Sequence, residues 1–295
     1  MTSWPALPLA EWRATRDTLH MWTQVVGKIR MALTPLINHW WNVPLYVSGR
    51  GLTTLAIPLG DRFFELEFDL CDHVLLLRMP GAEERLPLEP QTVAEFYAKT
   101  MAMLKRNGIE PEIWTTPVEV PDPIPFEEDT KHASYDRAYV ERFRDALALS
   151  NGVLTAFRGR FIGKCSPVHF FWGSFDLAVT RFSGRLASVK PDADVITREA
   201  YSHEVSSVGW WPGDDRLPEP SYYCYAAPEP AGFRTAAVLP RETYYNEALG
   251  GFYLPYDAVR QSADPEAALL QFCQTTYDAA ADFGKWDRAA LERDR

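Results

Sequence analysis

Histidine and carboxylate side chains near two predicted strands are the residues of this sequence best suited to chemistry. His203 and Glu204 are adjacent in the string AYSHEV at 200–205, and His169 lies seven positions before Asp176. Imidazole and carboxylate groups transfer protons near neutral pH, so these four residues are the candidate catalytic groups. Asp176 stands inside an apolar run, where a carboxyl group must be paired or functional.

The same four side chains have two alternative interpretations. A mixed set of nitrogen and carboxylate ligands would suit zinc, iron or manganese, but no tight ligand spacing supports a metal, and the sequence identifies no cofactor. Alternation along a strand places His203 on one face and Glu204 on the other, so the pair does not converge by itself. His169 and its counterpart His39 are also expected as structural residues that hydrogen-bond to the backbone at a turn.

Aromatic and basic residues form a second group of candidates, for ligand binding. Tryptophan and tyrosine side chains suit the walls of a pocket for a planar or apolar ligand, and we place Trp210 and Trp211 in a loop. Lys28 and Lys164 each follow a glycine, and they either bind an anion or lie on a solvated helix face. The candidate ligand-binding residues are Arg181, Tyr201, Trp172, Trp210, Trp211 and His132.

Composition excludes several classes of protein. The 295 residues carry a net charge of −10, which argues against binding to nucleic acid or to an anionic membrane surface. The four cysteines form no C-x-x-C pair, and the sequence lacks G-x-G-x-x-G, Walker, G-x-S-x-G and H-E-x-x-H motifs. No long apolar run and no signal peptide are evident. We therefore expect a cytoplasmic protein without a membrane span.

The two halves of the chain follow the same order of features. The helical stripe that begins at Val93 is repeated 176 positions later from Leu269, and Gly108 and Gly284 follow the two stripes at the same offset. Strand signals lie between the helices of each half. These strand signals are at residues 43–47, 63–68, 74–78, 175–179, 202–208 and 222–226.

This repetition predicts an α+β fold of two layers, in which antiparallel sheets pack against helices about a pseudo-twofold axis. We expect a first half at 1–116, a proline-rich strap at 117–133 and a second half at 134–295, together forming one two-lobed unit. Chance similarity between aromatic-rich segments is the alternative to duplication.

Two strings carry a resemblance to a known family. HFFWGSFDLAVTRFSGR at 169–185 and AYSHEV at 200–205 resemble a bacterial family of domains of unknown function, as do WPALPL at 4–9 and the strap at 117–126. The resemblance covers nearly the whole chain. It implies no activity, cofactor or site residue.

The sequence thus favours a protein that binds a small molecule between its halves, with His and carboxylate groups available for acid–base chemistry if it is an enzyme. A non-catalytic interaction or scaffold protein, acting on a partner or as a homo-oligomer, is the alternative. A metal-dependent enzyme is the second alternative.

Overall fold

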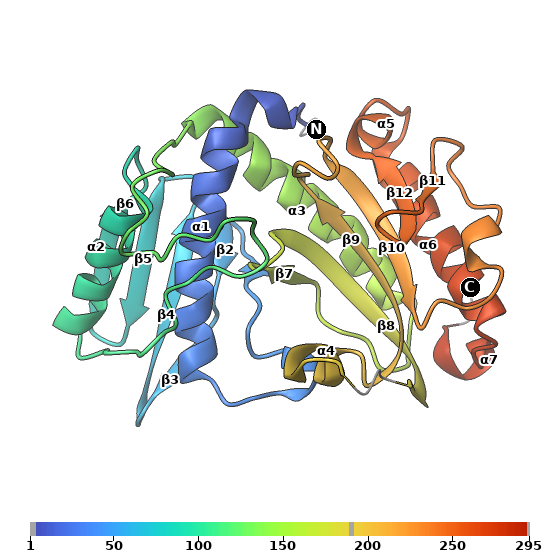
Figure 1. The fold of residues 1–295 in the computed structure, drawn as a ribbon, viewed down its shortest axis with the longest axis horizontal. Helices are drawn as coiled ribbons and strands as arrows, with labels where there is room; N and C mark the ends of the chain where they lie inside the picture. The colour runs from blue at the N-terminus through green and yellow to red at the C-terminus, as the bar shows by residue number, and fades with distance from the viewer. Residues whose placement is uncertain (1–3, 189–191, 294–295) are drawn as a thin grey trace.

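The computed structural model describes residues 4–188 and 192–293, and it contains helices and two antiparallel sheets, so the α+β class predicted from the sequence is correct. The first half begins with helix α1 and ends with α2, and a six-stranded sheet lies between them (Figure 1). The elements of this half are α1 (Leu9–Leu33), η1 (Asn38–Trp40), β1 (Tyr46–Val47), β2 (Gly51–Thr53), β3 (Ile57–Leu59), β4 (Arg62–Asp69), β5 (Val74–Met79), β6 (Ala82–Pro87) and α2 (Val93–Arg106).

The second half repeats the order of helix, antiparallel strands and helix. Its sheet runs in the order β11-β12-β10-β9-β8-β7. The elements are α3 (Arg137–Gly159), β7 (His169–Phe171), β8 (Asp176–Leu186), α4 (Val195–Ala200), β9 (His203–Trp211), β10 (Ser221–Ala227), η2 (Phe233–Thr235), β11 (Tyr244–Asn246), β12 (Gly251–Pro255), α5 (Tyr256–Arg260), α6 (Pro265–Phe283) and α7 (Arg288–Leu291). A common origin of the two halves stays a prediction.

The two sheets meet at the centre of the molecule. Leu45 and Phe170 exchange both of their backbone hydrogen bonds, at 2.9 and 2.8 Å, and so connect the start of β1 to β7. The buried aromatic and aliphatic side chains of both halves form one core. The first half and the second half therefore share a continuous interior.

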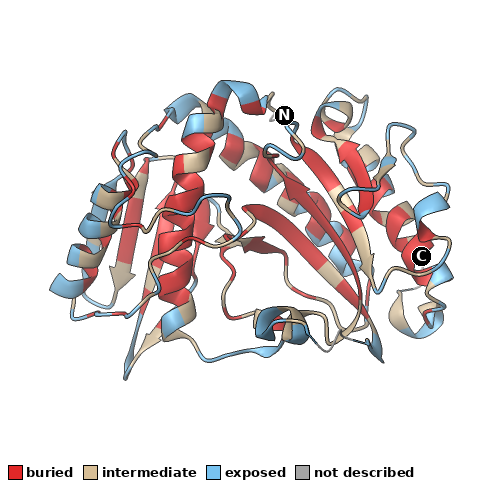
Figure 2. Ribbon diagram, viewed as in Figure 1, coloured by how far each residue is buried: buried red, intermediate tan, exposed pale blue. Residues whose placement is uncertain are grey.

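Helices cover opposite faces of the two sheets. In Figure 1, α1 crosses in front of the first sheet, whereas α3 lies behind the second, and α3 and α6 both contact its strands. Side chains alternate between the two faces along β8, so Leu177 and Val179 point toward these helices. Asp176, Ala178 and Thr180 point toward the front. No long helix crosses the front of β8 and β9, yet Figure 2 shows their residues as mostly buried. We call this side of the second sheet the front face.

The helix boundaries follow local chemistry. Thr92 and Glu95 form a reciprocal cap at the start of α2, and Asp136 caps α3 by accepting the backbone N–H groups of Ala138 and Tyr139. Gly108 adopts the left-handed conformation expected after a helix, with φ of +72°. Gly284 does not, since its φ is −74°, and the left-handed residue after α6 is Lys285, with φ of +53°.

Two local predictions were wrong. Trp210 and Trp211 lie in β9, where they pair with Tyr222 and Ser221 of β10, and both are buried. They do not form a loop because the strand alternation continues up to the Pro212–Gly213 turn. Lys28 is also buried, within α1, so it does not lie on a solvated helix face.

Candidate functional site

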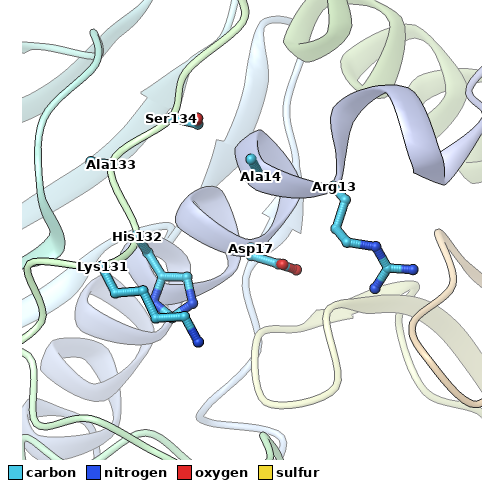
Figure 3. A pocket seen from close by; sticks show the side chains of 7 residues that line it. All are labelled: Arg13, Ala14, Asp17, Lys131, His132, Ala133 and Ser134. Atoms are coloured by element: carbon cyan, nitrogen blue, oxygen red, sulfur yellow. The ribbon is translucent and has the colours of Figure 1, made fainter.

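A hollow of about 270 Å³ lies between α1 and the loop that precedes α3 (Figure 3). Lys131 and His132 come from the loop, and Arg13 and Asp17 come from the helix, so residues of both walls bring polar groups to one space. The lining residues are Arg13, Ala14, Asp17, Lys131, His132, Ala133 and Ser134.

The loop wall is held in place by backbone contacts on two sides. The carbonyl groups of Asp129 and His132 accept the first free N–H groups of α2, from Ala94 and Val93, both at 3.1 Å. On the other side, the backbone N–H of Ser134 donates to Thr18 Oγ1 of α1 at 3.1 Å. Because the loop joins two helices in this way, the side chains that face the hollow start from a fixed backbone.

His132 is oriented by a buried carboxylate. Asp129 is 1% exposed. Its Oδ1 accepts hydrogen bonds from the backbone N–H groups of Lys131 and His132. Its Oδ2 accepts a hydrogen bond from Nδ1–H of His132 at 2.7 Å. A carboxylate at Nδ1 fixes the neutral tautomer that has its free lone pair on Nε2. The His132 ring can therefore accept a proton at Nε2 while Asp129 stabilises the resulting cation.

The charges around the hollow are mostly compensated. Arg13 pairs with Asp215 at 2.6 Å, and Arg16, next to the hollow, pairs with Asp17 at 2.8 Å. Lys131 is exposed and makes no ion pair with any residue that the structure describes. The uncompensated charge at the hollow is thus a cation, in a chain whose net charge is −10.

A second polar cluster lies on the front face around Asp176. The hydroxyl of Tyr223 donates to Asp176 Oδ2, whereas Oδ1 is buried without a partner at hydrogen-bonding geometry. Burial, reinforced by the charge of Glu119, raises the pKa of Asp176 to about 6. Burial likewise raises the pKa of Glu119 above its usual value. A carboxyl group tuned in this way can exchange a proton near neutral pH.

Glycine makes room for this cluster. A Cβ atom on Gly209 would lie 2.4 Å from the ring of Tyr223, and one on Gly173 would lie 2.5 Å from Glu119 Oε1. The tyrosine ring can therefore lie across β9 and reach Asp176 only because residue 209 has no side chain. Tyr201, at the end of α4, adds a hydroxyl that is 3.0 Å from the hydroxyl of Tyr225.

The structure brings His169 and Asp176 to the same face, but it does not gather all four candidate catalytic residues. His169 pairs with Ala178, two residues from Asp176 along β8, and burial lowers the pKa of His169 to about 3. The ring of His203 lies 5.6 Å from the ring of His39, farther along the face. Glu204 does not join them, because its carboxylate binds Arg185 at 2.6 Å.

The other candidate ligand-binding residues fall into two groups. Tyr201 and Trp211 belong to the front face, where Arg216 lies over the Trp211 ring at 5.1 Å. The remaining three residues are held inside the molecule by the helices. Arg181 lies 3.5 Å from the centre of the Phe157 ring on the helix-covered face, Trp172 donates to Val43 O at 2.8 Å, and Trp210 is fully buried.

Sequence reasoning named His132 but missed the residues that give it a role. Asp129, Lys131 and Arg13 were not considered, and neither was Glu119. The spacing of Asp129 and His132 was a usable signal, since an aspartate that turns back on the next backbone N–H groups can also reach a side chain three positions later. Arg13 is more than a hundred residues away and gave no such signal.

No group of three or more His, Cys, Asp or Glu side chains among residues 4–188 and 192–293 is placed to hold a metal ion. Within the same residues, no helix is both long and apolar enough to cross a membrane.

Comparison with protein families gives one match. The model of a family of unknown function, DUF5996, matches residues 4–293, which include both halves, the hollow and the front face. The chain belongs to the DUF5996 family. The DUF5996 match supports the resemblance found in the sequence and adds no activity to it. Curated proteins and solved structures include no match to the chain.

Proposed function

We propose that this protein binds a small anionic molecule in the hollow between α1 and residues 131–134, and that His132 transfers a proton to or from it. The observation that carries the proposal is the His132–Asp129 hydrogen bond of 2.7 Å at the wall of a space of about 270 Å³. A histidine whose tautomer is fixed by a buried carboxylate is the usual arrangement of a general base.

The charge of the ligand follows from the residues at the wall. Lys131 has no ion-pair partner among the described residues, and Arg13 shares its guanidinium with Asp215, whose side chain is 85% exposed. A carboxylate or phosphate group of the ligand would complement both cations, and Ser134 could supply a further hydroxyl. The volume suits a metabolite rather than a polymer.

Binding can be tested with a library of small carboxylates and phosphate monoesters, screened by thermal shift and followed by calorimetric titration. We expect binding that weakens about tenfold, or 1.4 kcal/mol, in the Lys131→Met variant. His132→Asn, which removes the Nε2 atom at the wall of the hollow, should weaken binding as well. Lys105→Met, on an exposed part of α2, is the matched control and should bind as the wild type does.

Two results would overturn this proposal. The first is a library in which no anionic compound binds. The second is a hit whose affinity is the same for the wild type and for Lys131→Met and His132→Asn, because such a compound binds elsewhere.

Self-association is a second candidate property, favoured by exposed apolar side chains near α4. Val195 and Ile196 are 70% and 60% exposed, and Leu186 at the end of β8 is 77% exposed. Sedimentation velocity of the wild type and of a Val195→Ser, Ile196→Ser double variant tests it. A dimer that is lost in the double variant supports this property, and a monomer at all concentrations rejects it.

A further inference from the structure

Lys164 has an unusual hydrogen-bond partner on the front face. Its Nζ lies 2.6 Å from Nε2 of His39, and this contact joins the two halves of the chain. Nδ1 of His39 faces the carbonyl oxygens of Glu199 and Ala200, at 3.1 and 3.3 Å. Two acceptors at Nδ1 place the ring proton there, so Nε2 carries the lone pair and accepts from the lysine.

The backbone of His39 is fixed for this contact. Its φ is +60°, in the left-handed region that few residues other than glycine adopt, and its N–H donates to Glu199 Oε1 at 3.0 Å. Strained conformations of this kind persist where the surroundings over-determine them, often at functional sites. Lys164 is fixed as well, because its carbonyl oxygen accepts the backbone N–H of Phe182.

Burial and the neighbouring aromatic rings act in opposite directions on the charge of the Lys164 amine. The Nζ atom lies 5.0 Å from the centre of the Phe182 ring and 5.5 Å from that of Trp41, and these contacts favour the ammonium form. Burial lowers the pKa of Lys164, and the charge of Glu199 opposes this change. His203, next to His39, is the other titratable side chain at this place. No carboxylate among the described residues pairs with the amine at ion-pair distance.

Lys28 is the internal comparison. It is also buried, and its amine donates to the backbone carbonyl groups of Trp114 and Thr116. Burial lowers the pKa of Lys28 to about 8, but carbonyl groups cannot relay a proton, and a side chain that is 1% exposed is closed to a carbonyl compound. Lys164 is partly exposed instead, and its partner is a base.

We propose that Lys164 is a nucleophilic amine that captures the carbonyl group of a small aldehyde or ketone as an imine. The neutral Lys164 amine, held by its hydrogen bond to His39 Nε2, attacks the carbonyl carbon, and the carbonyl electron pair moves to oxygen. His39 Nε2 takes one proton from the nitrogen of this adduct and passes it to the oxygen, which gives a carbinolamine. His39 then takes the second N–H proton and gives it to the hydroxyl, which leaves as water as the C=N bond forms. The net change is amine plus carbonyl to imine plus water, without oxidation or reduction.

This inference is independent of the hollow. His39, Trp41, Lys164 and Phe182 are not among the residues that line it, and the capture needs neither His132 nor a bound anion. The experiment below therefore does not test the proposed function, and either can fail alone.

Reductive trapping tests the proposal. The intact protein is treated with glyoxylate and cyanoborohydride at pH 7, and the modification rate of each lysine is measured by peptide mass spectrometry. A lowered pKa leaves more of the Lys164 amine neutral, and the hydrogen bond to His39 orients it, so Lys164 should react severalfold faster than Lys105. Its rate should also level off at a lower pH.

His39→Asn isolates the role of the base. Asparagine tolerates a positive φ and can still donate to the Glu199 carbonyl, but it offers no atom that takes a proton in place of Nε2. We expect the Lys164 rate to fall to that of Lys105 in this variant, with an unchanged urea midpoint. Equal rates for Lys164 and Lys105 in the wild type, or a Lys164 rate that His39→Asn leaves unchanged, would overturn the inference.

Discussion

The histidines of this protein differ in their burial and in their hydrogen-bond partners. His20 and His169 are buried, and burial lowers the pKa of each to about 3, so both remain neutral at physiological pH. His132 is only partly buried, and its Nδ1 is bound to a carboxylate. Proton transfer needs a ring nitrogen with a free lone pair at an accessible place, and His132 has one at Nε2 because Asp129 binds its Nδ1–H.

The Asp129→Asn substitution should change the tautomer of His132. The oxygen of the introduced amide can still accept the two backbone N–H groups, but the amide nitrogen would donate to His132 Nδ1 and move the ring proton to Nε2. Nitrogen–proton correlation NMR of the imidazole ring at pH 8 distinguishes the two tautomers. The resonances of His73, whose Nδ1 is 2.9 Å from the hydroxyl of Tyr135, should not move. An unchanged His132 spectrum would contradict the assigned geometry.

Asp176 predicts a pH dependence of stability. Burial raises its pKa from 3.8 to about 6, so the folded protein retains this proton where the unfolded chain has lost it. The folded state is therefore favoured below pH 4, and this contribution, about 3 kcal/mol, is lost as the pH rises to 6.

The Asp176→Asn variant cannot lose this proton. Relative to the wild type, it should be more stable at pH 7.5 than at pH 4 by up to about 3 kcal/mol, as measured by urea unfolding. Asp61→Asn in an exposed turn is the control. A constant difference between Asp176→Asn and the wild type at both pH values would show that the carboxyl titrates normally.

At the scale of elements, glycines determine how closely helices and strands approach. A Cβ atom on Gly27 of α1 would lie 2.2 Å from the Trp172 ring, whereas one on Gly152 of α3 would meet nothing within 4 Å. Both glycines are inside long helices, so the two positions differ in packing alone.

The substitution of alanine at these positions should therefore have opposite effects. Gly27→Ala should lower the free energy of unfolding by about 2 kcal/mol because the Trp172 ring must move. Gly152→Ala should raise it by about 0.5–1 kcal/mol through helix propensity. Thermal and urea unfolding of both variants gives the comparison. A Gly27→Ala variant as stable as the wild type would show that α1 and Trp172 are not packed as described.

The sequence predicted which helices and strands are present better than it predicted where they end. The apolar spacing that starts at Val93 and at Leu269 identified α2 and α6, because one stripe of each helix faces the core. The end of β9 was predicted wrongly because two tryptophans before Pro212 and Gly213 resemble a turn-rich loop. In the structure, Trp210 faces the helices and Trp211 the front face, which is the alternation of a strand.

At the scale of the whole molecule, contacts between distant residues formed the sites that the sequence did not reveal. Lys164 and His39 are 125 positions apart, and Tyr223 and Asp176 are 47 apart. Only the fold brings these pairs together, whereas Asp129 and His132 are joined by a local turn. The strap at 117–133 is held in a similar long-range way by Gln24 of α1, and Lys28 of α1 holds Trp114 and Thr116 just before it.

Removing the Lys28 amine should loosen the segment that leads into the strap. Lys28→Met leaves the carbonyl groups of Trp114 and Thr116 without their donor, so local opening there should become easier. The N–H of Val118 donates to Gln24 Oε1 at 2.9 Å, and its hydrogen exchange should be at least about tenfold faster than in the wild type, since hydrogen bonds to a charged group contribute about 1.5–3 kcal/mol. Lys105→Met is the control. Unchanged exchange of Val118 in Lys28→Met would show that other contacts hold this segment.

The most direct test of the proposed function is to locate a bound ligand. Crystals soaked with the small carboxylates and phosphate monoesters that pass the binding screen should show the anionic group in the hollow. We predict an oxygen of that group within hydrogen-bonding distance of Lys131 Nζ, with the ligand also contacting His132 Nε2. Ligand density found only outside the hollow, or density there that persists unchanged in crystals of a Lys131→Met, His132→Asn double variant, would contradict it.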